Sequence, residues 1–256
     1  MKGNPPATAR SMEPYWQDDA VTLYHGDARE VIPALHLFAD CIITDPPYGD
    51  TSLEWDRWPT DWLDFVALAA PQMWCFGSFR MFMRYWDQFS RWTYAQEIVW
   101  EKHNGTNPQN DRFRRVHELA VHFYRGEWAD IHKQPVMTND ATAMTVRRKK
   151  RPPQWGDIGA ASYRSEDGGP RLMNSVIYAR SCHGSAVHPT QKPEAIIAPL
   201  LEYSVPVGGT VLDCFAGSGT VLQVARKAGR KAIGIEARED YCRVIVDRLA
   251  QQELIA

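Results

Sequence analysis

Long hydrophobic runs are missing from this sequence, and their absence excludes several classes of protein. No apolar stretch in the 256 residues approaches the roughly 20 that span a bilayer. The N-terminal residues also contain no apolar segment of the kind that forms the core of a signal peptide. We therefore expect an intracellular, cytoplasmic protein that makes no contact with a membrane.

Cysteines are few, and no two of them are spaced like a metal or disulfide motif. The five residues stand singly, and four lie in or beside apolar runs. Such cysteines are typical of small buried side chains rather than of disulfides or zinc ligands. We expect no metal site.

The chain also lacks an excess of either charge. Its formal net charge of −2 provides no overall attraction to a polyanion, so nucleic acid would have to bind a local basic patch. One candidate patch is a run of five consecutive cations, and a looser group precedes it. The run comprises Arg147, Arg148, Lys149, Lys150 and Arg151, and the looser group Arg112, Arg114 and Arg115. The alternative for such a run is a solvated loop.

What the sequence does contain is an alternation of short β-like runs and amphipathic helical stretches. The seven β-like runs are Val21–His25, Asp40–Thr44, Gln72–Phe76, Ala95–Trp100, Glu118–Tyr124, Thr210–Asp213 and Lys231–Ile235. The expected helices are Trp62–Ala70, Phe79–Phe89, Thr220–Ala228 and Tyr241–Leu249. This alternation predicts an α/β domain with a mostly parallel sheet and helices on both faces. An apolar content of 44% is enough to fill its core.

Two segments depart from this rhythm. Residues 126–186 are rich in Pro, Gly, Arg, Ser and Asp, and have few periodic apolar positions. We expect an insertion there that packs beside the sheet. Residues 1–14 have few apolar groups and are expected to be disordered. The chain should fold alone or as a small oligomer such as a homodimer.

A glycine turn follows the sixth β-like run. Val211 to Thr220 has the pattern of a strand, a tight turn and a helix start, whose free amides can receive a polar ligand. The turn has neither the third glycine of a dinucleotide fingerprint nor the Gly-Lys-Ser/Thr of a phosphate loop. Glu236 ends the next run, about 20 residues on, where a carboxylate can reach both hydroxyls of a ribose. A sharp turn without a ligand is the alternative.

A second turn, with a carboxylate and two prolines, follows the second β-like run. It consists of Asp45, Pro46, Pro47 and Tyr48. The prolines restrict the backbone and leave carbonyls free, because proline cannot donate to a sheet. Asp45 and the Pro46 carbonyl could accept the hydrogens of a planar amine, while Tyr48 offers a stacking face. Such bonds would localise the amine lone pair toward an incoming methyl group. No Pro-Cys dipeptide occurs, so a cysteine nucleophile that attacks cytosine C6 is not indicated.

On these two turns and their order, the chain resembles the beta-class DNA amino-methyltransferases, which act on adenine N6 or cytosine N4. The resemblance runs from Val21 to Leu249 and implies a Rossmann-like methyltransferase fold with S-adenosylmethionine as cofactor. It implies a circularly permuted order, with a catalytic half at 15–125, a target-recognition insertion at 126–186 and a cofactor-binding half at 187–256. It also implies double-stranded DNA as the substrate, a flipped target base, and a bacterial or phage gene of the restriction-modification kind.

The resemblance assigns roles residue by residue. Asp45, Pro46, Pro47 and Tyr48 match the catalytic tetrapeptide, and Asp45 also borders the cofactor. The other residues assigned to the cofactor are Asp27, Ala28, Thr190, Gln191, Lys192, Asp213, Phe215, Gly217, Ser218, Gly219, Thr220, Glu236 and Ala237. The segment from Trp100 to Phe113, with His117 and Glu118, resembles the one that helps to hold the flipped base. Trp55, Trp58 and Trp62 follow the catalytic turn, and the choice for them is between the core and an edge of the base pocket.

The resemblance also implies an order of strands and leaves several functions open. The sixth run should be central, with the seventh and then Val21–His25 on one side. The second and third runs continue on the other side, and the remaining two form an outer pair with one antiparallel member. An aspartate that leads the tetrapeptide favours adenine N6 over cytosine N4. The alternatives are methylation of RNA, methylation of protein glutamine, and an inactive nucleic-acid-binding module.

Overall fold

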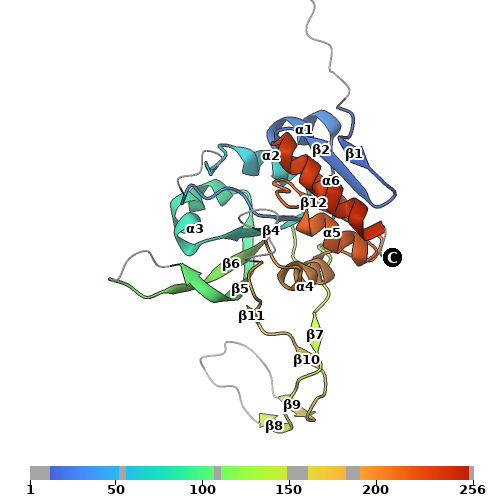
Figure 1. Cartoon of the computed structure of the whole chain (residues 1–256). Helices are drawn as coiled ribbons and strands as arrows, with labels where there is room; N and C mark the ends of the chain where they lie inside the picture. The colour runs from blue at the N-terminus through green and yellow to red at the C-terminus, as the bar shows by residue number, and fades with distance from the viewer. Residues whose placement is uncertain (1–11, 52–55, 107–110, 149–160, 183–190, 254–256) are drawn as a thin grey trace, which may run out of the picture. The chain divides into compact units, whose positions relative to one another are not determined.

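The computed structural model describes residues 12–51, 56–106, 111–148, 161–182 and 191–253. The chain divides into two compact units. The larger combines Met1–Lys133 with Ser175–Ala256, and the smaller spans Gln134–Asn174. The larger unit contains an extended sheet covered by helices (Figure 1). The predicted insertion, residues 126–186, includes the whole of the smaller unit and extends beyond it at both ends.

The described residues of the larger unit form a nine-stranded sheet in the order β1-β2-β13-β12-β3-β4-β6-β5-β11. In chain order the strands are β1 (Trp16–Gln17), β2 (Val21–His25), β3 (Cys41–Thr44), β4 (Gln72–Gly77), β5 (Thr93–Thr106), β6 (Arg115–Tyr124), β11 (Val176–Tyr178), β12 (Thr210–Asp213) and β13 (Lys231–Glu236). Strands β2, β13, β12, β3 and β4 are parallel to one another, whereas β6 runs antiparallel to both β4 and β5. The predicted α/β fold class is confirmed, and the seven predicted strands lie in the predicted order.

The sheet has two edge strands that the sequence did not indicate. Strand β1 pairs antiparallel with β2, and β11 pairs parallel with β5. With two and three residues, they are too short to show a periodic pattern. Strand β11 also lies within the predicted insertion, so the large sheet takes part of that segment.

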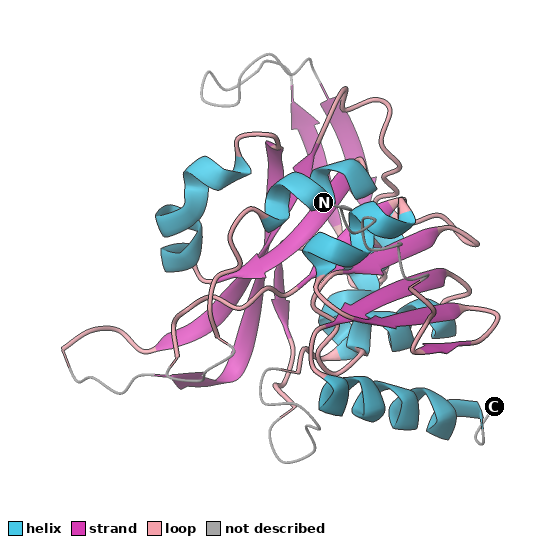
Figure 2. Ribbon diagram, turned by 90° about the horizontal axis from the view of Figure 1, so that it is seen from above, coloured by secondary structure: helices cyan, strands magenta, loops and turns pink. Residues whose placement is uncertain are grey.

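The central strands are apolar because both of their faces are covered. Every residue of β3 and of β4 is buried. Parallel strands buried on both faces have continuous apolar runs in place of an alternating pattern. Figure 2 shows helices on both sides of the sheet.

Six α-helices and one 3-10 helix lie in the described part of the larger unit. They are α1 (Ala28–Leu35), α2 (Trp62–Ala69), α3 (Phe79–Tyr85), η1 (Trp86–Phe89), α4 (Glu194–Ser204), α5 (Thr220–Lys227) and α6 (Glu239–Glu253). The four predicted helical stretches correspond to α2, to α3 with η1, to α5 and to α6. Helices α1 and α4 were not predicted. Each contains an internal proline, Pro33 or Pro199, which on sequence grounds argues against a helix.

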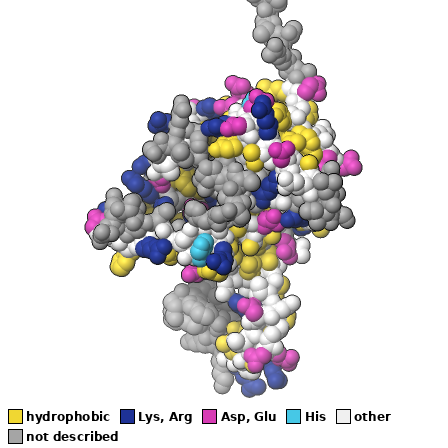
Figure 3. All heavy atoms as spheres, in the orientation of Figure 1, with side chains coloured by type: hydrophobic (Ala, Val, Ile, Leu, Met, Phe, Trp, Pro, Cys, Tyr) yellow, Lys and Arg dark blue, Asp and Glu magenta, His cyan; other side chains and the backbone are white. Residues whose placement is uncertain are grey.

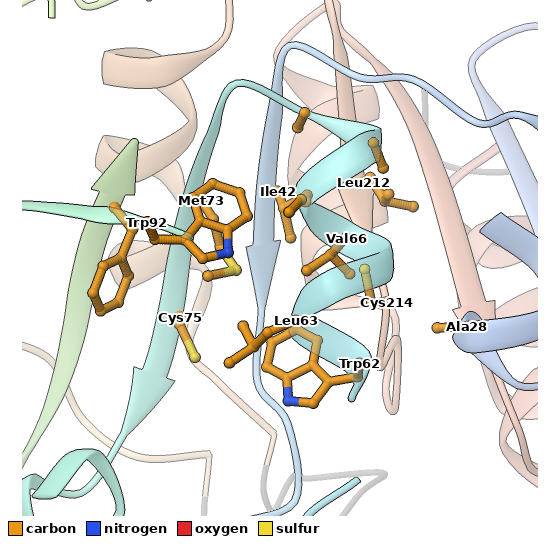
Figure 4. Close-up of a cluster of buried hydrophobic side chains, with 14 of the residues drawn as sticks. Ala28, Ile42, Trp62, Leu63, Val66, Met73, Cys75, Trp92, Leu212 and Cys214 are labelled. Atoms are coloured by element: carbon orange, nitrogen blue, oxygen red, sulfur yellow. The ribbon is translucent and has the colours of Figure 1, made fainter. Parts of the chain in front are cut away.

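Helices α1 and α2 close one face of the sheet over a core of large side chains (Figure 4). Trp62 and Val66 of α2 pack in this core together with Ile42, Met73 and Leu212 of three neighbouring strands. Complete burial of each aliphatic side chain contributes about 1.5–3 kcal/mol. This packing holds the first turn of α2 beside the carboxyl ends of β3 and β12, where the site lies.

The smaller unit contains two short antiparallel sheets among its described residues. One pairs β7 (Met137–Thr138) with β10 (Arg171–Leu172), and the other pairs β8 (Met144–Arg148) with β9 (Ala161–Ser165). An ion pair between Arg171 and Asp140 joins the ends of the first sheet, with an N–O distance of 2.7 Å.

Most of the N-terminal segment predicted to be disordered lies outside the described residues. Residues 1–11 of the segment expected to be disordered lie outside them, whereas Met12 packs against the core of the sheet. No helix in the described ranges is both long and apolar enough to cross a membrane.

Candidate active site

A cavity of about 250 Å³ opens at the carboxyl ends of the central strands. The glycine turn after β12, the Asp45 turn after β3 and Glu236 at the end of β13 all border it. Strands β12 and β3 are neighbours although their residues are about 170 positions apart. Carboxyl ends of parallel strands at such a position form the usual ligand site of open α/β sheets.

The glycine turn depends on two residues with left-handed backbones. Gly217 has φ 50° and Gly219 has φ 71°, a region that glycine enters without steric cost. Gly219 is the N-cap of α5, and a Cβ there would lie 3.0 Å from Ile245 of α6. Gly219 therefore serves the packing of the turn, and it does not line the cavity.

Glu236 is held by the backbone around it. Its Oε2 accepts a hydrogen bond from the Gly217 amide at 2.8 Å, and its Oε1 accepts one from the Arg238 amide at 2.9 Å. The residue is 8% exposed, and burial raises the pKa of its carboxyl. A carboxylate has about four acceptor positions, so Glu236 can still receive two hydroxyl donors from a ligand.

Asp27 borders the cavity from the start of α1. It is the N-cap of that helix, and its Oδ1 accepts from the Arg29 amide at 2.8 Å. The Arg29 guanidinium forms an ion pair with the same carboxylate at 2.6 Å. The hydrogen bond from this guanidinium lowers the pKa of Asp27. Asp27 is therefore ionised at neutral pH.

Asp45 is held by side chains from other segments. The Tyr48 hydroxyl donates to Oδ1, and the Lys192 ammonium donates to Oδ2. Burial raises the pKa of Asp45 above its usual range, although Lys192 acts in the opposite direction. Burial likewise raises the pKa of the Tyr48 hydroxyl, and the Asp45 charge adds to the shift. Tyr48 is therefore a neutral donor.

Lys192 pairs with Asp45, a contact that the sequence did not indicate. The resemblance placed it near the methionine end of the cofactor; in the structure it lines the cavity and also reaches Asp45 and Glu118. Burial alone would lower the pKa of Lys192, but the two carboxylates outweigh burial and the net shift is upward. Lys192 therefore carries a full positive charge in a buried position.

Asp213 ends β12 below the glycine turn. The Thr44 hydroxyl donates to its Oδ1 at 2.8 Å, and the Phe215 amide donates to the same atom at 3.2 Å. Burial raises the pKa of Asp213 to about 7. Its carboxyl thus changes protonation near neutral pH, unlike that of Asp27.

The cavity brings together most of the residues that the sequence assigned to the cofactor. The assigned residues that line it are Asp27, Ala28, Asp45, Lys192, Asp213, Phe215, Gly217, Ser218, Thr220, Glu236 and Ala237. Pro47 also lines it, whereas Pro46, Tyr48 and Gln191 do not. Thr190 lies outside the described residues.

Several residues that line the cavity were not predicted from the sequence. They include Arg29, Pro59, Phe76, Arg238 and Tyr241. Arg29 and Arg238 each follow an assigned acidic residue by two positions, and this spacing could have identified them. Trp62, for which the core was one of the two expected placements, is 1% exposed in the core, and it also lines the cavity.

The basic residues assigned to DNA fall in both compact units. Arg112, Arg114 and Arg115 are exposed at the start of β6, where Phe113 is 100% exposed and Arg112 pairs with Asp111. In the smaller unit Arg147 is exposed on β8, and Arg148 ends that strand. Lys149, Lys150 and Arg151 lie outside the described residues. On the face shown in Figure 3, Lys and Arg lie among Asp and Glu in small groups.

Metal ligands do not cluster in the described ranges. No group of three or more His, Cys, Asp or Glu side chains there is arranged to hold a metal ion. All five cysteines are free thiols: Cys41, Cys75, Cys214 and Cys242 are buried, and Cys182 is half-buried.

Comparisons with known proteins agree with this geometry. The chain is 27% identical to the type II methyltransferase M.ScaI of Streptomyces caespitosus, covering 93% of this chain and 84% of that protein. The crystal structure of an M1.HpyAVI-SAM complex superposes with a TM-score of 0.62 and 24% identity, covering 90% of this chain and 99% of that one. PvuII DNA methyltransferase, a cytosine-N4-specific enzyme, superposes with a TM-score of 0.61 and 15% identity, covering 92% and 88%. At these identities the two structures show a shared fold.

The family comparison covers the site itself. A family model described as DNA methylase, for enzymes of the N6 and N4 type, matches residues 39–247. This range includes the Asp45 turn, Lys192, the glycine turn and Glu236. The chain therefore belongs to the DNA methylase family of amino-methyltransferases.

Proposed function

We propose that this protein transfers a methyl group from S-adenosylmethionine to the N6 amine of adenine in double-stranded DNA. One observation carries the proposal: Asp45 and Glu236, from opposite parts of the sequence, border the same cavity at the carboxyl ends of β3 and β13. In this proposal the amine at Asp45 and the ribose at Glu236 would occupy neighbouring parts of one cavity. The family membership supports the reaction class.

The cavity offers the groups that this cofactor requires. Glu236 has acceptor positions left for the ribose hydroxyls, and Asp27 is a further carboxylate on the same wall. Trp62 also lines the cavity, and its buried indole N–H has no hydrogen-bond partner among the described residues. Glu236, Asp27, Trp62 and the glycine turn would hold the cofactor, which supplies an electrophilic methyl group on a sulfonium.

The protein side of the reaction is the orientation of a weakly nucleophilic amine. Asp45 and the Pro46 carbonyl would accept its two N–H hydrogens, which localises the nitrogen lone pair on the face toward the methyl group. Once the amine nitrogen had bonded to the methyl carbon and the carbon–sulfur bond had broken, the amine would be cationic and would release one proton. The raised pKa of Asp45 suits its carboxylate to receive that proton.

The choice of adenine rests on Asp45 as the first residue of the tetrapeptide. The fold does not decide it, because the cytosine-N4-specific PvuII DNA methyltransferase has a similar fold. A purine needs more room beside Tyr48 than a pyrimidine, and the flipped base would be read there. N4-cytosine methylation is the second candidate, because PvuII DNA methyltransferase carries it out on a similar fold.

We extend the proposal to the surroundings of the site. Residues 126–186 would read the target sequence, with 15–125 and 187–256 as the catalytic and cofactor-binding halves. Arg114, Arg115, Arg147 and Arg148 would contact phosphates. We also propose a bacterial or phage protein of a restriction-modification system, working in the cytoplasm as a monomer or homodimer; the relative from Streptomyces caespitosus supports the bacterial setting.

The test is a methyl-transfer assay with labelled S-adenosylmethionine against duplex DNA, RNA and protein. Methylated DNA is digested to nucleosides, and the product is identified by mass spectrometry. N6-methyladenine is the expected product. N4-methylcytosine alone would overturn the choice of base, and label in RNA or protein but not in DNA would overturn the choice of substrate.

A further inference from the structure

A chain of four alternating charges extends from the catalytic turn into the sheet. Lys192 pairs with Asp45 and lies 3.6 Å from Oε2 of Glu118, whose Oε1 pairs with Lys102 at 2.7 Å. The four residues come from four separate segments of the larger unit. The side chains of Lys192 and Glu118 are 8% and 14% exposed. With two ammonium and two carboxylate groups, these four side chains together carry no net charge.

One oxygen atom among these four side chains lacks a hydrogen-bond donor. Glu118 Oε2 is buried and has no hydrogen-bond partner among the described residues. The Lys192 ammonium is 3.6 Å away, a few tenths of an ångström beyond hydrogen-bond length. A buried acceptor without a donor costs free energy. Glu118 therefore attracts the ammonium that Asp45 holds in this structure.

Asp45, at the other end of the four side chains, has no oxygen without a hydrogen bond. Both oxygens of Asp45 already accept a hydrogen bond, from Tyr48 and from Lys192. A base amine that reaches Asp45 would compete with the Lys192 ammonium, which is the stronger donor because it is charged. An amine bound in that way would be poorly polarised.

We propose that Glu118 is a positioning residue that takes the Lys192 ammonium from Asp45 when the target amine arrives. The inference rests on the proposed function, since it concerns the amine site of the same reaction. The ammonium moves between two carboxylates, so Lys192 keeps a carboxylate partner throughout. Asp45 then keeps Tyr48 and gains the amine. Glu118 does not line the cavity, so it acts through Lys192.

The charged and titratable groups around the exchange define what a pH measurement reports. Those facing Glu118 are Lys192, Lys102, Arg115, Asp45 and Tyr48. Those facing Asp45 are Lys192, Glu118, Tyr48, Cys75 and Asp213. The Glu118 charge raises the pKa of Asp45. Without that charge Lys192 would stay on Asp45, and the pKa of Asp45 would fall.

Glu118→Gln is the principal test because it keeps the shape of the side chain and removes its charge. We expect kcat to fall roughly tenfold, as the amine meets an occupied carboxylate, and the affinity for S-adenosylmethionine to stay within about twofold. The acid limb of the kcat/KM profile, which reports free-enzyme pKa values, should move to lower pH. Glu97→Gln, the same exchange at an exposed position of the adjacent strand β5, is the control and should change neither quantity.

Lys102→Met tests the same exchange in the opposite direction. It leaves Glu118 with Lys192 as its remaining ammonium partner, so Lys192 is drawn from Asp45 and the acid limb should move to higher pH. This variant also carries the test if Glu118→Gln does not fold. If the four charged side chains only stabilised the fold, the acid limb of the kcat/KM profile would not move in opposite directions in the two variants.

A ¹³C carboxyl titration of Asp45 by NMR makes the outcome independent of turnover. Shifts in the two opposite directions, seen in the absence of DNA, would support the inference. An unchanged Asp45 titration in both variants, or shifts of the same sign, would overturn it. If the wild-type protein transfers no methyl group to DNA, the proposed function fails, and the titration still decides whether Lys192 exchanges between the carboxylates.

Discussion

The two acidic residues of the site are held in different ways. Glu236 accepts hydrogen bonds from two backbone amides within the turns that surround it. Asp45 accepts from two side chains, one of them 147 residues away in the sequence. Backbone amides that belong to a packed turn cannot leave their acceptor without distorting the fold, whereas a lysine ammonium can rotate to a second carboxylate.

This difference matches the tasks that we propose for the two residues, binding of the cofactor by Glu236 and of the target amine by Asp45. A cofactor site gains affinity when its groups are already in place, because little freedom is lost on binding. An amine site has to give up its resting partner before it can polarise the substrate. We therefore expect the Glu236 end to govern cofactor affinity and the Asp45 end to govern rate. The following predictions test that division.

The largest effect is expected at the Asp45 end. Asp45→Ala should reduce kcat at least about a hundredfold, the scale for removing one preorganised hydrogen bond to the transition state. Lys192 would keep Glu118 as a partner, so the variant should still fold. Turnover is measured with labelled cofactor and binding by calorimetry. A loss of cofactor affinity as large as the loss of rate would show that Asp45 serves the cofactor instead.

At the other end, Glu236→Ala should weaken S-adenosylmethionine binding by roughly 1.5–3 kcal/mol, the scale of charge-assisted hydrogen bonds. The amides of Gly217 and Arg238 lose their acceptor, so a lower melting temperature without cofactor is also expected. Calorimetry on the variant is compared with Glu239→Ala, an exposed carboxylate on α6 that pairs with Arg243. Equal dissociation constants in the two variants would move the ribose site elsewhere.

Between the two ends, Asp213 should make stability depend on pH. Its pKa is raised by burial from 3.8 to about 7. Between about pH 4 and 7 the folded protein therefore keeps a proton that the unfolded chain has released, and the free energy of unfolding falls as pH rises. The slope from this group reaches about 1.4 kcal/mol per pH unit.

Asp213→Asn should flatten this dependence. The amide oxygen can still accept from Thr44 and Phe215, and the variant has no proton to lose. Urea unfolding of the two proteins at several pH values between 4 and 8 measures the difference. The same slope in both proteins would show that Asp213 is ionised throughout that range.

The smallest effect is expected outside the site, at the basic residues. Replacing Arg147 and Arg148 by serine should weaken binding to all duplexes alike. It should also reduce the salt dependence by about one unit of slope for each phosphate that the protein no longer binds. Neither kcat at saturating DNA nor cofactor affinity should change. Binding titrations at several salt concentrations measure the slope, and a wild-type slope would identify the run as a solvated loop.

Local patterns were sufficient where a segment is buried over several residues. The runs that became β2 and β12 were predicted with their observed ends, because each has buried apolar residues, Val21 and Leu23 in β2 and Val211 and Leu212 in β12, bounded by polar residues. The same reasoning failed for α1 and α4. Pro33 and Pro199 argue against a helix locally, and in the structure the packing of each helix on its neighbours outweighs that local penalty.

The candidate site was predictable in its turns and not in its contacts. Asp45 and Glu236 could be identified because each directly follows or ends a strand, where parallel strands present their carboxyl ends. The ion pair of Lys192 with Asp45 could not be identified. Any of the 29 Lys and Arg residues could in principle have faced Asp45, and only the fold selects one.

By itself the sequence determined the α/β class, the strand order that the resemblance implied, and the two turns that carry the acidic residues. These features follow from burial and backbone conformation, which act over a few neighbouring residues. Tertiary structure alone decided that Lys192, Glu118 and Lys102 meet behind Asp45, and that Trp62 of α2 both packs in the core and lines the cavity. Long side chains form these contacts across neighbouring strands, and the local sequence pattern does not indicate which side chains will meet.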